Sequence, residues 1–317
     1  MAFDNIVSRA DAQSLIPLPV AQEIQKAVIE ESAALRLFKT VPMSSKTERM
    51  PVISALPVAA WVTGDTGLKE TTEANWADKT LVVEELACIV PIPDAVIADA
   101  AFDIWGEIRP LIAEAMARAL DSAVFFGTNK PPSWPADVVA MAVAAGNVVS
   151  VGANTTAKGG TAEDINATMA TVEADGYDVN GFVTSRAFRS KLRGARDVNG
   201  QRYLDIDANG DRVEGQPVAY AMRGLWPNPA ALGSAQLIAG DFTKGIIGVR
   251  QDITYKLFTE GVIQNGTGAI IYNLLQQDMS AMRVVARYAY QVANPINYSN
   301  NTETSRAPFG VLRTAPV

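Results

Sequence analysis

Residues 103–127 read DIWGEIRPLIAEAMARALDSAVFFG and contain the strongest helical pattern in the chain. Apolar side chains recur along it at spacings of three and four residues: Ile104, Ile108, Leu111, Ile112, Ala115, Met116, Ala119, Leu120 and Ala123. This spacing places them in one stripe, so it predicts a long amphipathic helix over 103–126 that stops at Gly127. Pro110 interrupts the pattern, which predicts either a kink there or a helix that begins near residue 109.

The segment before this helix has strand-like pieces but no run of residues long enough to build a core. A polar stretch over 63–79 separates these pieces, which lie at 50–53, 59–63 and 80–83. A two-stranded hairpin is marginal in water, and a structureless loop of this length is unusual within a compact domain. We therefore expect this hairpin to pack on another molecule.

Seven side chains of the hairpin are candidates for contacts with a second subunit: Trp61, Asp65, Lys69, Glu70, Glu73, Trp76 and Lys79. The charged ones form either a solvated tip or a set that fixes the register against a neighbour, because complementary charges orient a complex more than they tighten it. The two tryptophans are either anchors within the chain or interface residues. An aromatic side chain on a segment without a core is more useful at an interface.

The N-terminal region predicts an arm followed by a short helix. Residues 1–19 include Pro17 and Pro19 and are typical of an extended arm. Residues 20–38 carry apolar side chains at roughly helical spacing, which predicts a short amphipathic helix.

The part of the chain after the long helix predicts a mixture of helices and strands, and hence an α+β fold. The expected elements are a helix over 161–174, a strand over 181–184, a helix over 185–193, a turn at 197–200, and strands at 235–239, 245–251, 255–258, 270–275 and 282–292. From Ser299 onward the sequence is polar, with Pro308 and Pro316, which predicts an arm or a poorly ordered tail.

Composition limits the possible partners. Apolar residues make up 48% of the 317 residues and charged residues only 19%, below the roughly 25% usual in soluble proteins, which suggests surface hidden by partners. The formal net charge is −7 and no basic block is present, so tight nucleic-acid binding is not expected. A mildly acidic protein is compatible with a container for DNA, since it repels phosphates weakly.

The sequence offers no sign of export or of redox chemistry. Cys88 is the single cysteine and lies in an apolar run, so we expect a buried inert thiol and no intrachain disulfide. The N-terminus lacks the pattern of a signal peptide, and polar residues break the most apolar stretch, 138–153. We expect a protein that stays in the cytosol where it is made, without a membrane partner.

The inventory of chemical groups argues against an enzyme. Histidine is absent, which excludes Ser-His-Asp and Cys-His catalysis, and no phosphate-binding or dinucleotide-binding glycine motif is present. Residues 205–210, DIDANG, match the first half of a calcium loop, but Gln216 stands where the bidentate Glu belongs and Asn209-Gly210 favours a β-turn. We predict neither a metal nor a cofactor.

The order of these pieces resembles the major capsid proteins of tailed bacteriophages, which have the Hong Kong 97-like fold. The resemblance extends over residues 20–298 and rests on eight phrases: Ala60-Trp61-Val62 before an acidic stretch, LACIVPIPD at 86–94, LDSAVFFG at 120–127, GFVT at 181–184, DVNG at 197–200, GQPV at 215–218, GDF at 240–242, and RVVAR at 283–287 before Asn294-Pro295.

This resemblance implies an α+β capsid fold with an N-terminal arm and a long extended loop. The implied regions are an arm with a short helix (1–43), the extended loop (44–86), a peripheral domain with a spine helix (87–150 and 265–298), an axial domain (151–264) and a C-terminal tail (299–317). It also implies hexamers and pentamers that close an icosahedral shell around double-stranded DNA, assembled in the host cytoplasm. Separate scaffolding, portal and decoration proteins are the further partners it suggests.

Two departures from the family pattern matter. Some relatives carry a long cleaved scaffolding segment, whereas about twenty residues precede the first helix here, so a separate scaffolding protein is expected. Some relatives form Lys-Asn crosslinks; Lys69, Lys79, Asn294 and Asn297 are present, but nothing in the sequence indicates a pairing, and we expect none. The alternative functions are an encapsulin-like compartment shell, which shares the fold, and an α+β enzyme, which the missing motifs disfavour.

Overall fold

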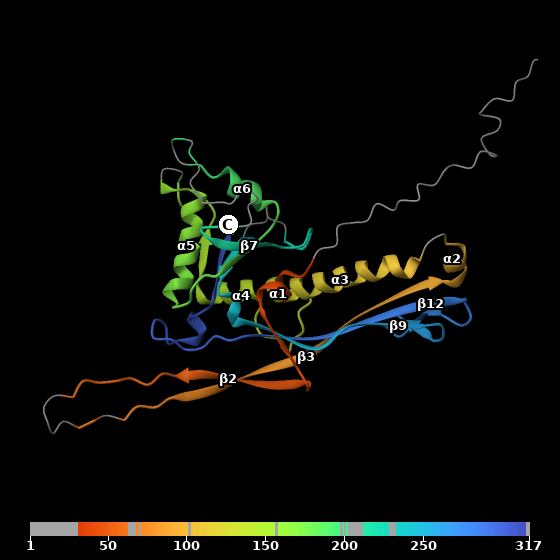
Figure 1. Cartoon of the computed structure of the whole chain (residues 1–317), viewed down its shortest axis with the longest axis horizontal. Coiled ribbons are helices and arrows are strands. Elements are labelled where there is room, and N and C mark those ends of the chain that lie inside the picture. Colours follow the sequence, from red (N-terminus) through yellow and green to blue (C-terminus); the bar gives the residue numbers. More distant parts are fainter. Residues whose placement is uncertain are drawn as a thin grey trace, which may run out of the picture.

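A computed structural model describes residues 31–62, 68–69, 71–100, 103–155, 158–196, 199, 201, 212–227 and 233–314. The molecule is elongated, with a long sheet along its length and a second sheet toward one end (Figure 1). The helices are α1 Ala33–Leu37, α2 Asp94–Asp99, α3 Ile104–Phe126, α4 Val138–Ala145, α5 Thr161–Ala174 and α6 Phe188–Gly194, with short 3-10 helices η2 Phe242–Lys244 and η3 Glu303–Ser305.

The strands form two sheets and a separate hairpin. They are β1 Lys39–Pro42, β2 Thr47–Ala55, β3 Asn75–Pro93, β4 Val148–Ser150, β5 Gly181–Thr184, β6 Arg212–Val213, β7 Gln216–Tyr220, β8 Ala235–Gly240, β9 Gly245–Phe258, β10 Val262–Gln264, β11 Ile270–Asn273, β12 Met279–Val292 and β13 Phe309–Arg313. The long sheet has the order β1-β9-β12-β3-β2 and the second sheet β4-β13-β8-β5-β7-β6, while β10 pairs with β11.

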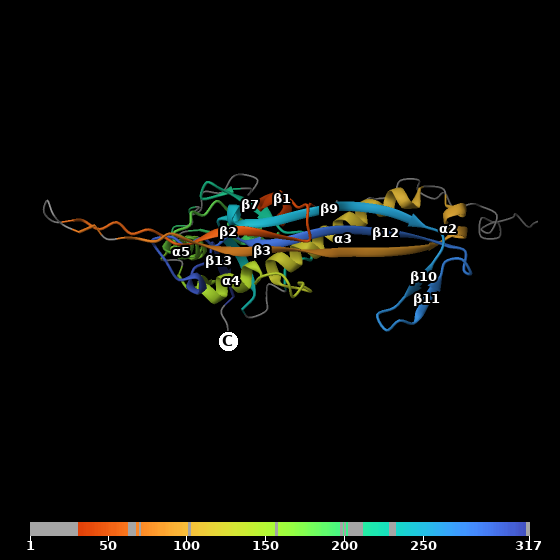
Figure 2. The ribbon, with the colours of Figure 1, turned by 90° about the horizontal axis from the view of Figure 1, so that it is seen from below.

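The long helix α3 confirms the expectation for 103–126. Gly127 ends it in the left-handed conformation, φ +67°, and its N–H donates to the carbonyl of Ala123, as glycine favours at this position. Of the two alternatives offered for Pro110, a helix that begins near residue 109 is wrong: α3 begins at Ile104 and Pro110 lies inside it. Figure 2 shows α3 running along the long sheet, onto which it packs Ile112, Met116, Leu120 and Val124.

The long sheet is built around β12, which has a long antiparallel partner on each side. β12 pairs with β3 from Met279↔Pro93 to Ala289↔Val83 and with β9 on its other side, and β1 adds to β9 in parallel. The two strands expected at 245–251 and 255–258 form the single strand β9. β3 is likewise continuous from the extended loop into the sheet, so the loop is an extension of a core strand.

The expectation of a poorly ordered tail after Ser299 is wrong. β13 lies inside the second sheet, antiparallel to β8 and parallel to β4, and Phe309, Val311 and Leu312 are fully buried. The sequence did not predict this strand, because β13 is short and follows the polar stretch 299–306. Its pairing partners, β4 and β8, are distant in the sequence. β9, which was expected in the axial region, belongs to the long sheet.

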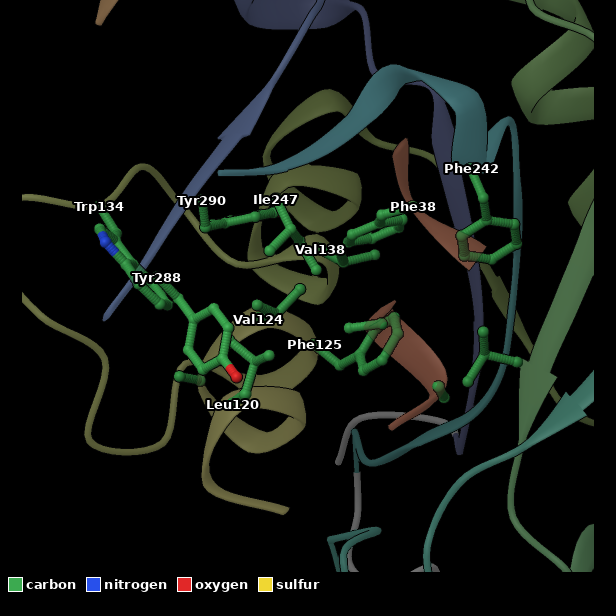
Figure 3. Close-up of a cluster of buried hydrophobic side chains, with 14 of the residues drawn as sticks. Phe38, Leu120, Val124, Phe125, Trp134, Val138, Phe242, Ile247, Tyr288 and Tyr290 are labelled. Atoms are coloured by element: carbon green, nitrogen blue, oxygen red, sulfur yellow. The ribbon is translucent and has the colours of Figure 1, made fainter. Parts of the chain in front are cut away.

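One aromatic cluster joins the two sheets (Figure 3). The ring of Phe38 lies 5.7 Å from that of Phe125 on α3, 5.9 Å from Phe242, 6.2 Å from Tyr290 on β12 and 6.1 Å from Phe309 on β13, measured between centroids. Phe38 therefore connects the segment after α1 to both sheets. The helix expected over 20–38 is seen here as α1, and its residues 20–30 lie outside the described part.

The remaining expectations have mixed outcomes. α5 and β5 confirm the helix over 161–174 and the strand over 181–184. The strand expected at 59–63 is wrong over 59–62, where the chain is irregular, and Cys88 is half-buried. Most of the turn at 197–200 and the calcium-like stretch 205–210 lie outside the described residues.

Candidate assembly surfaces

The extended loop has an ordered base and an irregular outer part. β2 and β3 pair from Thr47↔Val82 to Ile53↔Trp76, and the register shifts before Ala55↔Asn75. Beyond that pair, the described residues 56–62, 68–69 and 71–74 contain no strand. In Figure 1 the loop projects far beyond the rest of the molecule.

The base of the loop has a small core within its own chain. Met43, Leu81, Val83 and Ala289 are buried together, and Met50 packs against them. The Glu48 carboxylate accepts hydrogen bonds from the backbone N–H groups of Ser44 and Ser45 and from the Ser44 hydroxyl, and these bonds, chiefly that from the Ser44 N–H, lower the pKa of Glu48. The direction in which the loop leaves the sheet is therefore fixed by the chain itself.

The outer part of the loop, by contrast, exposes large apolar side chains. Trp61 is fully exposed, Leu68 is 93% exposed, Val58 70% and Trp76 68%. Scattered single apolar residues on a surface are ordinary, but four large ones on one projection indicate an interaction surface. We call the described residues 56–62, 68–69 and 71–76 the loop tip.

The structure places four of the seven candidate contact residues on the loop tip and one, Lys79, at the base of the loop. Trp61, Lys69, Glu73 and Trp76 lie exposed on the loop tip. Asp65 and Glu70 lie outside the described residues.

Lys79 differs from these, because it lies at the base and is engaged within the chain. Its ammonium forms an ion pair with Glu303 at 3.0 Å and donates a hydrogen bond to the carbonyl of Val292 at 3.4 Å.

A tether that the sequence did not reveal holds the loop from the other side. The tether is the segment 293–306, between β12 and β13. The Ile296 N–H donates a hydrogen bond to the carbonyl of Ile53 at 3.3 Å, and the Tyr298 hydroxyl donates one to the carbonyl of Pro57 at 2.8 Å. Ile296 and Tyr298 lie just before Ser299, where the expected tail begins. No local pattern marks them, since their role depends on where β12 and β13 end.

A buried polar cluster anchors the same segment. Arg306 is 3% exposed and donates from Nε to the Asn294 side chain at 3.1 Å and from Nη2 to the Asn294 carbonyl at 3.0 Å. The Asp175 carboxylate accepts from the Asn147 side chain, the Ala307 N–H and the Asn300 side chain at 2.8–2.9 Å. Buried polar groups with satisfied partners rigidify their surroundings, so this cluster fixes the join between the two sheets.

Asp121 fixes the point where the N-terminal region enters the fold. This fully buried carboxylate on α3 accepts hydrogen bonds from the Ser32 hydroxyl at 2.5 Å and from the N–H groups of Ala33 and Ala34 at 2.9 and 3.1 Å. Burial raises the pKa of Asp121, while the hydrogen bonds from Ser32, Ala33 and Ala34 act in the opposite direction. The start of α1 is thereby attached to the spine of the molecule.

The described residues include no cluster typical of a metal centre. Among the described residues, no group of three or more Cys, Asp and Glu side chains could hold a metal ion. A hollow on β3, β9 and β12 is lined by charged groups that already have partners: Arg287 pairs with Glu85 at 2.7 Å, and Lys256 and Arg283 stack over Phe258. Within the described part of the chain, no helix has the length and apolar character needed to cross a membrane.

A spine helix on a long sheet, a second sheet joined through one core, and a projecting loop with an unpartnered apolar tip define a subunit of the Hong Kong 97-like fold. The chain belongs to the phage capsid family, whose model matches residues 12–297. It is thus a structural protein of a phage capsid, and its place is the virion.

Known relatives and solved structures agree with this assignment. A chain of Microbacterium phage Oxtober96 is 40% identical, with a TM-score of 0.86 over 98% of this chain and 100% of that one. A chain of Mycobacterium phage Cain is 31% identical, with a TM-score of 0.85 over 98% of this chain and 99% of that one. The major capsid protein of Staphylococcus phage 80alpha is 26% identical over 92% of this chain and 86% of its own length.

Proposed function

We propose that this chain is the major capsid subunit that assembles into hexamers and pentamers and closes an icosahedral shell around the double-stranded DNA of the phage. The observation that carries the proposal is the loop tip, where Trp61 and Trp76 project from an ordered base into solvent. The role is structural and requires no catalysis.

The geometry of the loop determines the kind of contact that it can make. Its tip and the body of the molecule are different surfaces, so a contact between the tip of one copy and the body of the next is head-to-tail. Contacts of this kind close rings when the rotation allows, and rings of five and six units build a closed shell. Tryptophans that become buried at the centre of such an interface typically contribute most of its energy.

The two sheets take different places in this proposal. The long sheet with α3 forms the peripheral domain. The second sheet forms the axial domain around the hexamer or pentamer axis. Its strands β5 to β8 lie within the expected range 151–264, and β4 and β13 join it from outside that range. The loop over 44–86 lies across the neighbouring subunit and the region 1–43 clasps another neighbour. Lys69 and Glu73 set the register of the tip against the neighbouring subunit. Asp65, Glu70 and Lys79 are proposed to contribute to the same contact.

The charge of the chain supports a role as a container for DNA. With a net charge of −7 it repels phosphate weakly and gains little from counterion release, so it encloses DNA without sequence-specific binding. Assembly in the host cytoplasm, with separate scaffolding, portal and decoration proteins, completes the proposal. The named relatives are phage proteins, and no feature of the structure favours an encapsulin-like compartment.

Electron microscopy of the purified protein tests the proposal. The unmodified chain should form hexamers, pentamers or closed shells. Trp61→Ala with Trp76→Ala should reduce particle yield while leaving the thermal unfolding midpoint of the subunit unchanged, and the matched pair Trp61→Phe with Trp76→Phe should recover most of the yield. A stable monomer at high concentration would contradict the proposal, and so would particles that contain enzyme cargo in place of nuclease-protected DNA.

A further inference from the structure

One segment of the chain is strongly basic, although the chain as a whole is acidic. Residues 186–196 contain no Asp or Glu, whereas the net charge over all 317 residues is −7. The segment has five cationic side chains: Arg186, Arg189, Lys191, Arg193 and Arg196. The expectation that the chain has no basic block does not hold for this segment, which is called the basic patch below. In Figure 1 its helix, α6, lies beyond β7 on the side away from the long sheet.

The fold of α6 directs the cationic side chains outward. Phe188 and Leu192 are one turn apart, are each 1% exposed, and pack in the apolar core of the second sheet. This pair fixes one face of the short helix against the sheet. Lys191, Arg193 and Arg196 are exposed, and the Lys191 ammonium lies 5.7 Å from the centroid of the Phe188 ring. The patch is therefore held on an ordered part of the molecule.

Three of these cations have no counter-charge of their own. Within the part of the chain that the structure describes, Lys191, Arg193 and Arg196 form no ion pair with a carboxylate. Other cations do form such pairs, namely Arg49, Lys79, Arg118, Lys244 and Arg287. Neighbouring cations repel one another, and a bound polyanion removes this repulsion while it releases small counterions. The patch thus favours a polyanion from outside the chain.

A hollow of about 510 Å³ beside the patch has room for phosphate groups. Lys191 and Arg196 border it on one side, and on the other side it is lined by the chain before α5, including Gly152, Gly159 and Gly160. Glycines leave the backbone open to close approach. Asp164 also lines the hollow, but its carboxylate already accepts from the N–H groups of Gly152 and Asn154 at 2.7 and 3.0 Å.

The composition of the patch distinguishes nucleic acid from protein as the partner. Its large apolar side chains are buried, and its other exposed residues are small: Ala187, Ser190 and Gly194. Protein interfaces have apolar and aromatic side chains at their centre and are poor in lysine, whereas DNA interfaces are strongly positive. Contact with the same patch of a second copy would bring like charges together. The phosphate backbone of a nucleic acid fits this surface best.

We propose that the basic patch binds the phosphate backbone of the enclosed double-stranded DNA, without sequence preference, through Lys191, Arg193 and Arg196. The inference rests on the proposed function as a container for DNA. Each copy contacts few phosphates, so one contact is weak, but repetition over a shell adds many such contacts. The rest of the acidic chain repels phosphate, so the patches determine where DNA touches the shell.

Fluorescence anisotropy of a labelled duplex of arbitrary sequence tests this contact, with the unassembled full-length chain at a series of salt concentrations. The combined variant Lys191→Gln, Arg193→Gln and Arg196→Gln should bind at least about tenfold more weakly at low salt, because three phosphate contacts are lost. The slope of log K against log salt should become shallower by about 2 to 3. Wild-type affinity and slope in this variant would overturn the proposal.

Two further variants separate the patch from general charge and from folding. Lys46→Gln with Arg109→Gln and Arg250→Gln removes the same charge from exposed positions outside the patch, and its binding should stay close to that of the wild type. An equal loss in this control would overturn the proposal. Lys191→Arg with Arg193→Lys and Arg196→Lys keeps the charge and should keep the binding. Circular dichroism confirms that each variant folds.

Competition and assembly distinguish the other sources of negative charge. Polyglutamate should displace the duplex poorly; displacement as strong as by unlabelled duplex would assign the patch to an acidic protein. Inorganic phosphate at the same phosphate concentration should also compete poorly, and equal competition would assign the hollow to the free ion. Either result would overturn the proposal. The glutamine variant should still form particles, and their loss would identify the patch as a subunit contact instead. Absence of particles from the unmodified chain contradicts the proposed function, whereas duplex binding is measured independently of it.

Discussion

The ammonium of Lys79 lies 3.0 Å from the carboxylate of Glu303, and this ion pair ties the base of the extended loop to the segment that connects the two sheets. The Lys79 side chain is 21% exposed and that of Glu303 is 66% exposed, so solvent screens the pair. The ion pair therefore acts mainly by fixing the direction of the loop, and contributes little to stability. Two further hydrogen bonds, from Ile296 and Tyr298, support the same arrangement.

Glu303→Gln should therefore lower the free energy of unfolding by less than about 1 kcal/mol, as for exposed ion pairs in general. It should nevertheless increase the hydrogen exchange of backbone amides around Lys79, because the loop base loses its tether. Hydrogen exchange with mass spectrometry checks this, with Glu173→Gln on the exposed side of α5 as the matched control. Unchanged exchange around Lys79 would show that the ion pair does not position the loop.

Asp121→Ala should lower the free energy of unfolding by at least about 2 kcal/mol, because it leaves the Ser32 hydroxyl and two backbone N–H groups without their acceptor in a buried site. Chemical denaturation measures the change. Asp99→Ala, at an exposed position of α2, should have little effect. Equal effects of the two substitutions would contradict the role of Asp121 as the anchor of α1.

The raised pKa of Asp121 gives a pH dependence with a definite sign. Because burial raises this pKa above its ordinary value of 3.8, the folded chain holds the proton more tightly than the unfolded chain. The part of the stability that comes from this pKa shift is therefore fully present below pH 3.8 and is lost as pH rises through the raised pKa. The stability of the wild type relative to Asp121→Asn should fall over that range, and a relative stability that rises with pH would contradict it.

Gly240→Ala tests the docking of β13. A Cβ at this position would lie 2.5 Å from the Pro308 carbonyl oxygen and 2.6 Å from the Phe309 ring, so β8 and β13 would have to separate. We expect a loss of about 1–3 kcal/mol in the free energy of unfolding, typical of overpacking. Gly194→Ala, where no atom lies within 4 Å of the added Cβ, is the matched control. A neutral Gly240→Ala would contradict the close approach of these two strands.

The sequence predicts the elements whose pattern is local. The stripe from Ile104 to Ala123 and the glycine stop at Gly127 define α3 within one residue, and the polar start at Thr161 defines α5. Pro110 does not delay the start of α3. Trp61 and Val62 are strand-forming types, yet 59–62 form no strand, and no described residue pairs with them.

The elements that depend on distant partners could not be predicted. β13 is a strand because β4 and β8 flank it, and the sequence around it has the polar character of a tail. The ion pair of Lys79 with Glu303 depends on the same long-range arrangement. For the candidate site, the sequence left Trp61 and Trp76 as either anchors within the chain or interface residues, and the structure shows both side chains exposed.

The central claim is that the loop tip finds its packing on another copy of the chain. Because Ala55 and Asn75 face each other across β2 and β3, residues 56–74, which are the loop tip without Asn75 and Trp76, can be replaced by an Asn-Gly turn that closes the shortened hairpin. Sedimentation velocity of this variant is the most direct test. The account predicts a folded subunit that sediments without forming shells, and shells formed at wild-type yield would contradict it.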